Sequence, residues 1–320
     1  MSDLDLRPSL RECGGRAGVP GQPVRELLNA REASLGATGV RRLLPNLGRR
    51  MVGAWCFVDH YGPDDIADEP GMQVPPHPHT GLQTVSWLHE GEILHRDSVG
   101  SVQVLRPRQL GLMTSGRAIA HSEQSAVPHP RLLHGAQLWV ALPDAHRNIA
   151  PAFEHHVDLP VVTGPGLTAT VVLGGLDGAV SPGTTYSPLV GADLALAEGA
   201  AVRLPVEPDF EYAVLTMSGA TEVDGVRLDP GSMLYLGSGR TELPLRALSD
   251  SGLLLIGGEP FEEEIVMWWN FIGRSHEEIE SARKDWMEST RFGAVTGYEG
   301  ARLPAPELPP VALKPRGRVR

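Results

Sequence analysis

Short runs of apolar and β-branched residues, separated by glycine, proline and other turn residues, follow one another along the first half of the chain. These runs occupy residues 82–88, 92–98, 101–107, 110–116 and 133–143. Short strands at close spacing with turn residues between them are typical of an all-β sandwich or barrel. The pattern therefore predicts a first β-barrel domain, which we place at residues 25–150.

A second series of the same kind follows a polar junction at residues 145–160. Its runs occupy 167–175, 200–206, 211–228, 232–237 and 251–258. Within the series, Asp224 and Gly225 supply the positive φ angles that a tight hairpin turn requires. The chain is therefore predicted to be all-β, with two tandem β-sandwich (jelly-roll) barrels, the second over residues 151–298.

The pattern becomes helical near residue 275. Ser275 and Glu278 have capping-box spacing, and apolar residues follow along one side of the predicted helix. These residues are Ile279, Ala282, Trp286 and Met287. We expect a short C-terminal helix that packs against a barrel, a flexible leader over residues 1–24, and a flexible, proline-rich and basic tail over residues 299–320.

Composition narrows the class of protein. The 320 residues are 41% hydrophobic and 21% charged, which is typical of a globular protein. A net charge of -11 disfavours direct nucleic-acid binding, and no apolar run is long enough for a membrane span or a secretory signal. The chain has two cysteines, Cys13 and Cys56, which are too few for a disulfide framework, so the cytoplasm is the expected location. The adjacent Trp268 and Trp269 are expected to pack in the core.

Histidine pairs are the first candidates for chemistry. Twelve histidines produce about 0.45 His-x-His pairs by chance, so the context of each pair must decide. His77 and His79 lie among three prolines that keep the backbone extended, and residues two apart on a strand share a face. His121 and Glu123 have the same spacing in another extended stretch. If the strands close into a barrel, both pairs can face its interior, where a divalent cation would stabilise a buried cluster of three imidazoles and a carboxylate.

Other His-x-acid pairs have simpler explanations. His276 and Glu278 begin the predicted helix, where residues two apart diverge. His156 and Asp158 lie in the junction without further ligands nearby. His95 and Asp97 close a hairpin, and polar turn residues need no metal to explain them. We therefore predict the metal ligands His77, His79, His121 and Glu123, and the alternative is a hydrogen-bonded polar network of the same side chains without a metal.

Several segments of the chain resemble the pirin family of bicupins. They are "VDHYGP" (58–63), "PPHPHTGLQTVSWLHEGE" (75–92), "HRDSVG" (95–100), "MTSGRAIAHSE" (113–123), "GGEPFEEEIVMWWNF" (257–271), "SHEEIESARKDW" (275–286) and "RFG" (291–293). The resemblance implies two cupin barrels with one metal, usually iron, in the first barrel. The same four residues would be its ligands. Two positions depart from the family pattern: Gln83 replaces the usual glutamate, and Thr80 the usual arginine, so the resemblance implies that an acid near the metal is missing.

The predicted ligand set of three imidazoles and one carboxylate suits iron, nickel, copper, manganese, cobalt or zinc. The resemblance implies a dioxygenase of the quercetinase type, which opens a flavonol with dioxygen, and Glu123 is the candidate general base. The alternative is a metal- and redox-dependent regulator that binds protein partners without turnover. A metal-stabilised barrel without activity is a third reading. No histidine lies between His156 and His276, so the second barrel cannot repeat the site.

Overall fold

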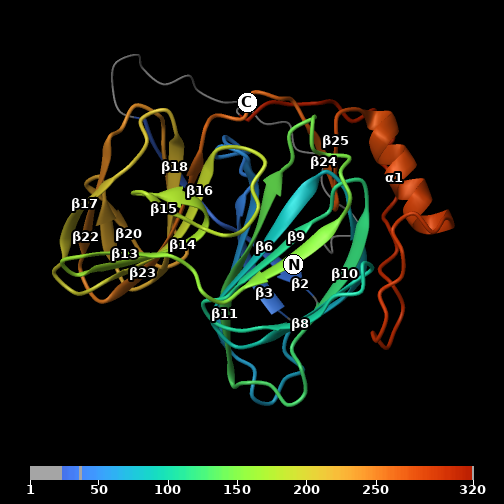
Figure 1. The fold of residues 1–320 in the computed structure, drawn as a ribbon, viewed down its shortest axis with the longest axis horizontal. Helices are drawn as coiled ribbons and strands as arrows, with labels where there is room; N and C mark the ends of the chain where they lie inside the picture. Colours follow the sequence, from blue (N-terminus) through green and yellow to red (C-terminus); the bar gives the residue numbers. More distant parts are fainter. Residues whose placement is uncertain (1–23, 36–37, 319–320) are drawn as a thin grey trace.

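The computed structural model describes residues 24–35 and 38–318, and shows two β-sandwiches side by side. In Figure 1 the first sandwich carries the helix α1 on its outer flank, on the side away from the second sandwich. The predicted architecture, all-β with two tandem barrels and a short C-terminal helix, is confirmed.

The first sandwich consists of a seven-stranded and a four-stranded sheet. The larger sheet has the order β12-β9-β6-β11-β4-β3-β2 and the smaller one β5-β10-β7-β8. In that order the larger sheet comprises Ala152–His156, Leu110–Thr114, Leu82–Glu90, Leu132–Ala141, Trp55–Asp65, Thr38–Leu44 and Arg31–Leu35. The smaller sheet comprises Gln73–His79, Ile119–Gln124, Ile93–Asp97 and Val102–Leu105.

The second sandwich repeats this plan with an eight-stranded and a four-stranded sheet. The larger sheet has the order β1-β21-β18-β23-β16-β14-β13, with β15 paired to β14, and the smaller one β17-β22-β19-β20. The larger sheet comprises Arg25–Leu28, Met233–Leu236, Glu211–Ser218, Ser251–Gly258, Leu189–Leu196, Leu167–Leu176, Val161–Gly164 and Ala179–Val180. The smaller sheet comprises Ala201–Pro205, Glu242–Ala247, Thr221–Val223 and Val226–Leu228.

Strand pairing crosses the predicted domain boundaries. β1 pairs with β21 of the second sandwich, although it precedes the first sandwich in sequence. β12, after residue 150, pairs with β9 of the first sandwich. The boundaries at residues 25–150 and 151–298 stay a prediction. The leader at 1–24 lies, except for residue 24, outside the described residues.

The chain returns to the first sandwich after the second is complete. A hairpin of β24 (Val266–Trp268) and β25 (Phe271–Gly273) precedes α1 (His276–Glu288). Ser275 caps α1 by accepting a hydrogen bond from the Glu278 N–H, as predicted. The buried face of the helix carries Ile279, Ala282 and Trp286, which pack with Ala118 and Ala120 of the first sandwich. The prediction was wrong for Met287, which is 40% exposed.

Segments around 303–318 also contact the body of the protein. Leu303 donates its N–H to the Pro76 carbonyl, and Arg316 pairs with Ile265 in an isolated bridge. Arg318 forms an ion pair with the buried Glu211. Flexibility of the 299–320 tail stays a prediction about motion, while these contacts place its described part against both sandwiches.

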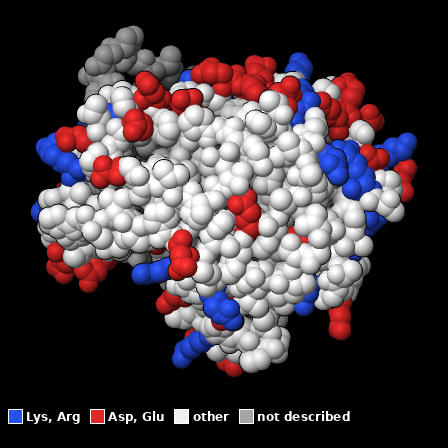
Figure 2. Space-filling view, viewed as in Figure 1, with Lys and Arg blue, Asp and Glu red and all other residues white. Residues whose placement is uncertain are grey.

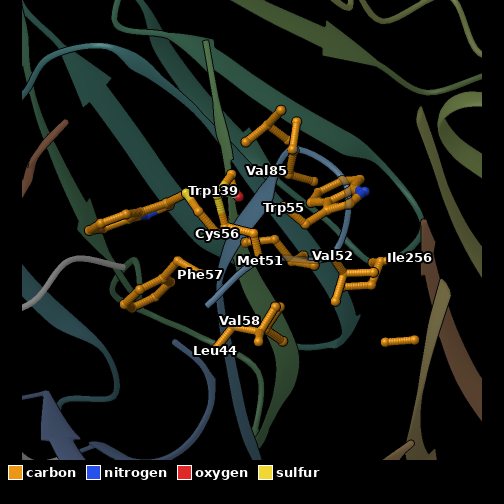
Figure 3. Close-up of a cluster of buried hydrophobic side chains, with 14 of the residues drawn as sticks. Leu44, Met51, Val52, Trp55, Cys56, Phe57, Val58, Val85, Trp139 and Ile256 are labelled. Atoms are coloured by element: carbon orange, nitrogen blue, oxygen red, sulfur yellow. Dashed lines mark hydrogen bonds between the residues drawn. The ribbon is translucent and has the colours of Figure 1, made fainter. Parts of the chain in front are cut away.

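An apolar core joins the two sandwiches. Figure 3 shows Val52 and Trp55 of the first sandwich close to Ile256 of the second, and Val58 and Val85 belong to the same apolar cluster. Phe57 stacks on Trp139, with the ring centroids 4.1 Å apart. One contiguous apolar cluster therefore includes residues of both sandwiches.

The charged side chains lie mainly at the edges of the face in Figure 2, with acidic groups along its upper rim and a broad uncharged centre. This face shows no continuous basic surface of the kind that nucleic-acid phosphates require. Among the described residues, no helix combines the length and apolar character needed to cross a bilayer.

Candidate metal centre

Strands β5 and β10 bring the two predicted pairs together. The strands are antiparallel neighbours, with His121 opposite His77. β5 is the edge strand of its sheet, so its prolines remove few ladder hydrogen bonds while keeping the strand extended. An irregularity in register between His121 and Glu123 leaves both side chains buried, together with His77 and His79.

The ligand atoms of these side chains form two overlapping groups. His77, His79 and His121 place ring nitrogens within 4.8 Å of one another, and His121 shares a second such group with Glu123 and His95. The Nε2 atoms of His79 and His121 are 3.1 Å apart. Two nitrogens that each lie about 2.1 Å from one ion at roughly a right angle would be about 3 Å apart. The predicted residues therefore converge, and metal binding by them stays a prediction.

In two of these histidines the ring nitrogen that points away from the cluster, here called the outer nitrogen, already has a hydrogen-bond partner. His77 Nδ1 donates to the Pro75 carbonyl over 2.8 Å, and His79 Nδ1 donates to the Asn270 carbonyl over 3.1 Å. A carbonyl accepts only, so each Nδ1 carries the proton and each Nε2 presents a lone pair. His77 Nε2 is buried without a hydrogen-bond partner among the described residues. An orphaned lone pair facing neighbouring imidazoles fits a divalent cation.

Burial also keeps these imidazoles neutral. It lowers the pKa of His77 to about 4 and the pKa of His79 well below 6.5. Burial, together with His77 and His79, lowers the pKa of His121 well below 6.5 as well. Because metal binding requires the deprotonated ring, the cluster is in the binding form at neutral pH.

The Glu123 carboxylate contacts a side chain of the larger sheet, on the opposite side of the sandwich. Ser86 Oγ, on β6, lies 3.1 Å from Glu123 Oε1 and 2.9 Å from Gln137 Oε1. The hydroxyl has one proton, so it can donate to only one of these two oxygens at a time, and donation to Glu123 Oε1 helps to hold the carboxylate beside His121. Trp139 packs edge-on against His79, with centroids 5.2 Å apart, and closes one side of the cluster with an aromatic wall.

The structure adds His95 and Asp97, which the sequence argument assigned to a hairpin. β7 pairs with β10, so that His95 lies opposite Glu123 and Asp97 opposite His121. His95 Nδ1 is 3.5 Å from His121 Nδ1, and His95 Nε2 is 3.1 Å from Asp97 Oδ2. The sequence did contain a signal for these two residues, because His95 and Asp97 have the same His-x-acid spacing on a strand as His121 and Glu123.

Gln83 does not belong to the cluster, which corrects the expectation that its substitution removes an acid near the metal. Gln83 and Ser86 are three positions apart on β6, so their side chains leave opposite faces of the sheet. Gln83 Nε2 donates to Thr114 Oγ1 over 2.9 Å and to the Thr184 carbonyl of the second sandwich over 3.0 Å. The residue faces the seam instead.

The β24–β25 turn supplies the carbonyl that orients His79. Its backbone passes close to the cluster, where Ile272 N donates to the Thr80 carbonyl over 3.0 Å. Gly81 has a φ of +70°, and a Cβ there would lie 2.4 Å from the Ile272 carbonyl oxygen, so this approach requires glycine. Trp269, buried as predicted for the core, adopts a φ of +52° before Asn270. A segment from the end of the chain thus completes the surroundings of His79.

The remaining sequence candidates lie elsewhere. His156 pairs with Glu154 on β12, and His276 accepts a hydrogen bond from Leu313 N at the start of α1. The interior of the second sandwich is a cluster of leucine, valine and alanine side chains. Within the described residues, the groups of three His, Cys or acidic side chains with converging ligand atoms both contain His121.

Comparison with known proteins identifies the family of this chain. The Pirin family matches residues 37–140, and the Pirin C-terminal cupin domain matches residues 191–293. A Pseudomonas aeruginosa protein named "Putative quercetin 2,3-dioxygenase" is 47% identical over 314 residues, which cover 97% of this chain and 98% of that protein. The chain belongs to the pirin family. Human Pirin is 30% identical, with 71% of this chain and 79% of that protein covered.

A solved pirin-fold structure is also close. Quercetin 2,3-dioxygenase from Acinetobacter baumannii, determined at 1.78 Å, superposes with a TM-score of 0.87 and 43% identity. The match covers 90% of this chain and 97% of that one. The family and the bicupin fold are thus shown by sequence and by structure.

Proposed function

We propose that this pirin is a mononuclear metal dioxygenase of the quercetinase type, which opens a flavonol with dioxygen. The observation that carries the proposal is the buried convergence of His77, His79 and His121 beside Glu123. The names of the similar Pseudomonas and Acinetobacter proteins support the same activity.

The donor set suits a divalent transition metal, and iron is the first candidate. His77, His79 and His121 would hold it through Nε2, with Glu123 as the oxygen ligand. When bound, such a metal supplies Lewis acidity and one-electron chemistry with dioxygen.

The protein's own groups would prepare the substrate. Glu123 would take the proton from the flavonol 3-hydroxyl, while Ser86 keeps the carboxylate in place. Trp139 beside His79 and Phe153, stacked on His95 with centroids 4.2 Å apart, form aromatic walls. Flat apolar walls favour a planar aromatic substrate and exclude water from the proton transfer.

Oxygen uptake with quercetin tests the proposal. Protein loaded separately with iron, nickel, copper, manganese, cobalt or zinc should consume dioxygen with quercetin in at least one metal form, faster than the free metal. Glu123→Gln should lower the rate by about 10²-fold or more, because the amide cannot accept the proton. No uptake in any metal form would reject the dioxygenase, and metal-dependent capture of a protein partner would then favour the regulator.

A further inference from the structure

His121 differs from the other two histidines of the cluster in what its outer nitrogen meets. His77 and His79 face carbonyl oxygens, which fix their tautomers outright. His121 Nδ1 faces another imidazole, His95 Nδ1, at 3.5 Å. An imidazole nitrogen can donate or accept, so this contact alone does not decide which nitrogen of His121 carries the proton.

Asp97 decides it. His95 Nε2 lies 3.1 Å from Asp97 Oδ2, and a carboxylate only accepts, so His95 Nε2 carries the proton. In this tautomer His95 Nδ1 is bare and accepts from His121 Nδ1–H. His121 is left with a bare Nε2, and this atom faces His79 Nε2 at 3.1 Å. We propose that Asp97, acting through His95, holds His121 in the tautomer that presents Nε2 to a metal ion.

The side chains of Asp97 and His95 are both held in place. Asp97 Oδ1 accepts hydrogen bonds from the N–H groups of Val99 and Ser101, over 3.0 and 2.9 Å, so the carboxylate cannot rotate freely. The His95 ring is 2% exposed and stacks on Phe153 at an interplanar angle of 11°. Burial raises the pKa of Asp97, but hydrogen bonds from His95 and Ser101 outweigh it and hold this pKa below its usual range.

The geometry makes Asp97→Asn a sharp test. The two backbone N–H groups at Oδ1 would retain the amide oxygen, so the NH2 group would face His95 Nε2. His95 would then accept at Nε2 and donate from Nδ1, which forces the proton of His121 onto Nε2. The substitution changes few atoms yet inverts both tautomers.

The inference rests on the proposed metal centre but not on the flavonol. Zn²⁺ and Co²⁺ affinities measured by chelator competition should fall about 10- to 100-fold in Asp97→Asn and in His95→Leu. His95→Gln should lose less, because its side-chain oxygen can accept from His121 Nδ1–H. Long-range ¹H–¹⁵N spectra of the metal-free protein should show His121 protonated at Nδ1 in the wild type and at Nε2 in Asp97→Asn.

Glu154→Gln is the matched control. Glu154 and His156 lie on β12, are also two residues apart, and also form a 3.1 Å contact between the imidazole Nε2 and a carboxylate oxygen. Glu154 accepts a further hydrogen bond from the Thr184 N–H. This variant should keep the wild-type affinity and the His121 tautomer. Equal affinity in Asp97→Asn and the wild type would overturn the positioning role alone. Loss of metal in His95→Gln as complete as in His121→Ala would also overturn it, by making His95 a ligand. A wild type that binds neither ion would reject the metal centre together with this inference.

Discussion

Two clusters of buried histidines occupy different places in the first sandwich, and their closest contacts look alike. Inside the sandwich, His79 and His121 bring their Nε2 atoms to 3.1 Å. At the seam with the second sandwich, His60 and His134 bring theirs to 3.0 Å. The distance between nitrogens therefore does not distinguish a metal site from a hydrogen bond.

The groups around each cluster distinguish the two. At the seam, Arg41 presents only donors to the His60 ring, with its Nε 3.3 Å from Nδ1 and its Nη2 3.4 Å from Nε2, and His60 Nε2 contacts His134 Nε2. The guanidinium also puts a positive charge beside the pair. In the interior cluster the outer nitrogens of His77 and His79 donate to carbonyls, the ligand atoms converge, and Glu123 supplies negative charge. Hydrogen-bond donors outside a cluster thus decide whether it can accept a cation.

The largest expected difference is in metal content. Protein purified without added metal should contain about one divalent ion per chain, and His121→Ala should reduce this nearly to zero because a central ligand is lost. His134→Ala, the matched change at the seam, should retain the wild-type content. Elemental analysis of both variants measures this, and equal metal content in wild type and His121→Ala would contradict the assignment.

The next effect concerns stability at the seam. Gln83→Glu restores the acid of the family pattern, but its carboxylate would face the Thr184 carbonyl instead of the metal. Two acceptors then meet in a buried site, and we expect a loss of about 1–3 kcal/mol in the free energy of unfolding. Metal affinity should stay unchanged. Urea denaturation and chelator competition measure the two quantities, and an increase in metal affinity would show that residue 83 reaches the metal after all.

The smallest effect is a pH dependence. Burial and Arg41 lower the pKa of His60 to about 2, and burial and His89 lower the pKa of His134 to about 4. Unfolded histidine titrates near 6.5, so between pH 6.5 and 4 the unfolded chain binds protons that the folded protein excludes. The stability of metal-free protein should therefore fall as pH is lowered through this window. Each histidine contributes at most about 1.4 kcal/mol per pH unit.

His134→Gln isolates the contribution of the seam, because the interior histidines also have lowered pKa values. Urea denaturation at pH 7.5, 6 and 5 should give a shallower loss of stability in this variant than in wild type. The same slope in both proteins would mean that His134 does not titrate as its surroundings indicate. Salt should alter the result little, since both rings are buried.

Much of the fold was accessible to local reasoning. Period-two runs and turn residues identify most strands of both sandwiches, and the capping box locates the start of α1. The prolines around His77 indicate an extended segment, and the two-residue spacing of His121 and Glu123 on a strand indicates that their side chains share a face. These inferences succeed because alternation, chain stiffness and helix capping act over a few residues.

The failures involve contacts between segments far apart in sequence. His95 and Asp97 read as turn residues because nothing local shows that β7 pairs with β10. Gln83 was assigned to the metal cluster by family pattern, whereas the pleat of β6 turns it toward Thr184, 101 residues away. The Asn270 carbonyl contacts His79 across 191 residues, and a backbone acceptor leaves no trace in side-chain identity.

By itself, the sequence determined that this chain forms two β-sandwiches, that the second cannot repeat a histidine site, and which four side chains are the candidate ligands. The tertiary structure decided which nitrogens of His77 and His79 are protonated, that His95 and Asp97 lie next to His121, and which face Gln83 occupies. The physical reason is that strand alternation is a property of neighbouring residues. The position of a proton on an imidazole depends on donors and acceptors that only the folded sheets bring within hydrogen-bond distance.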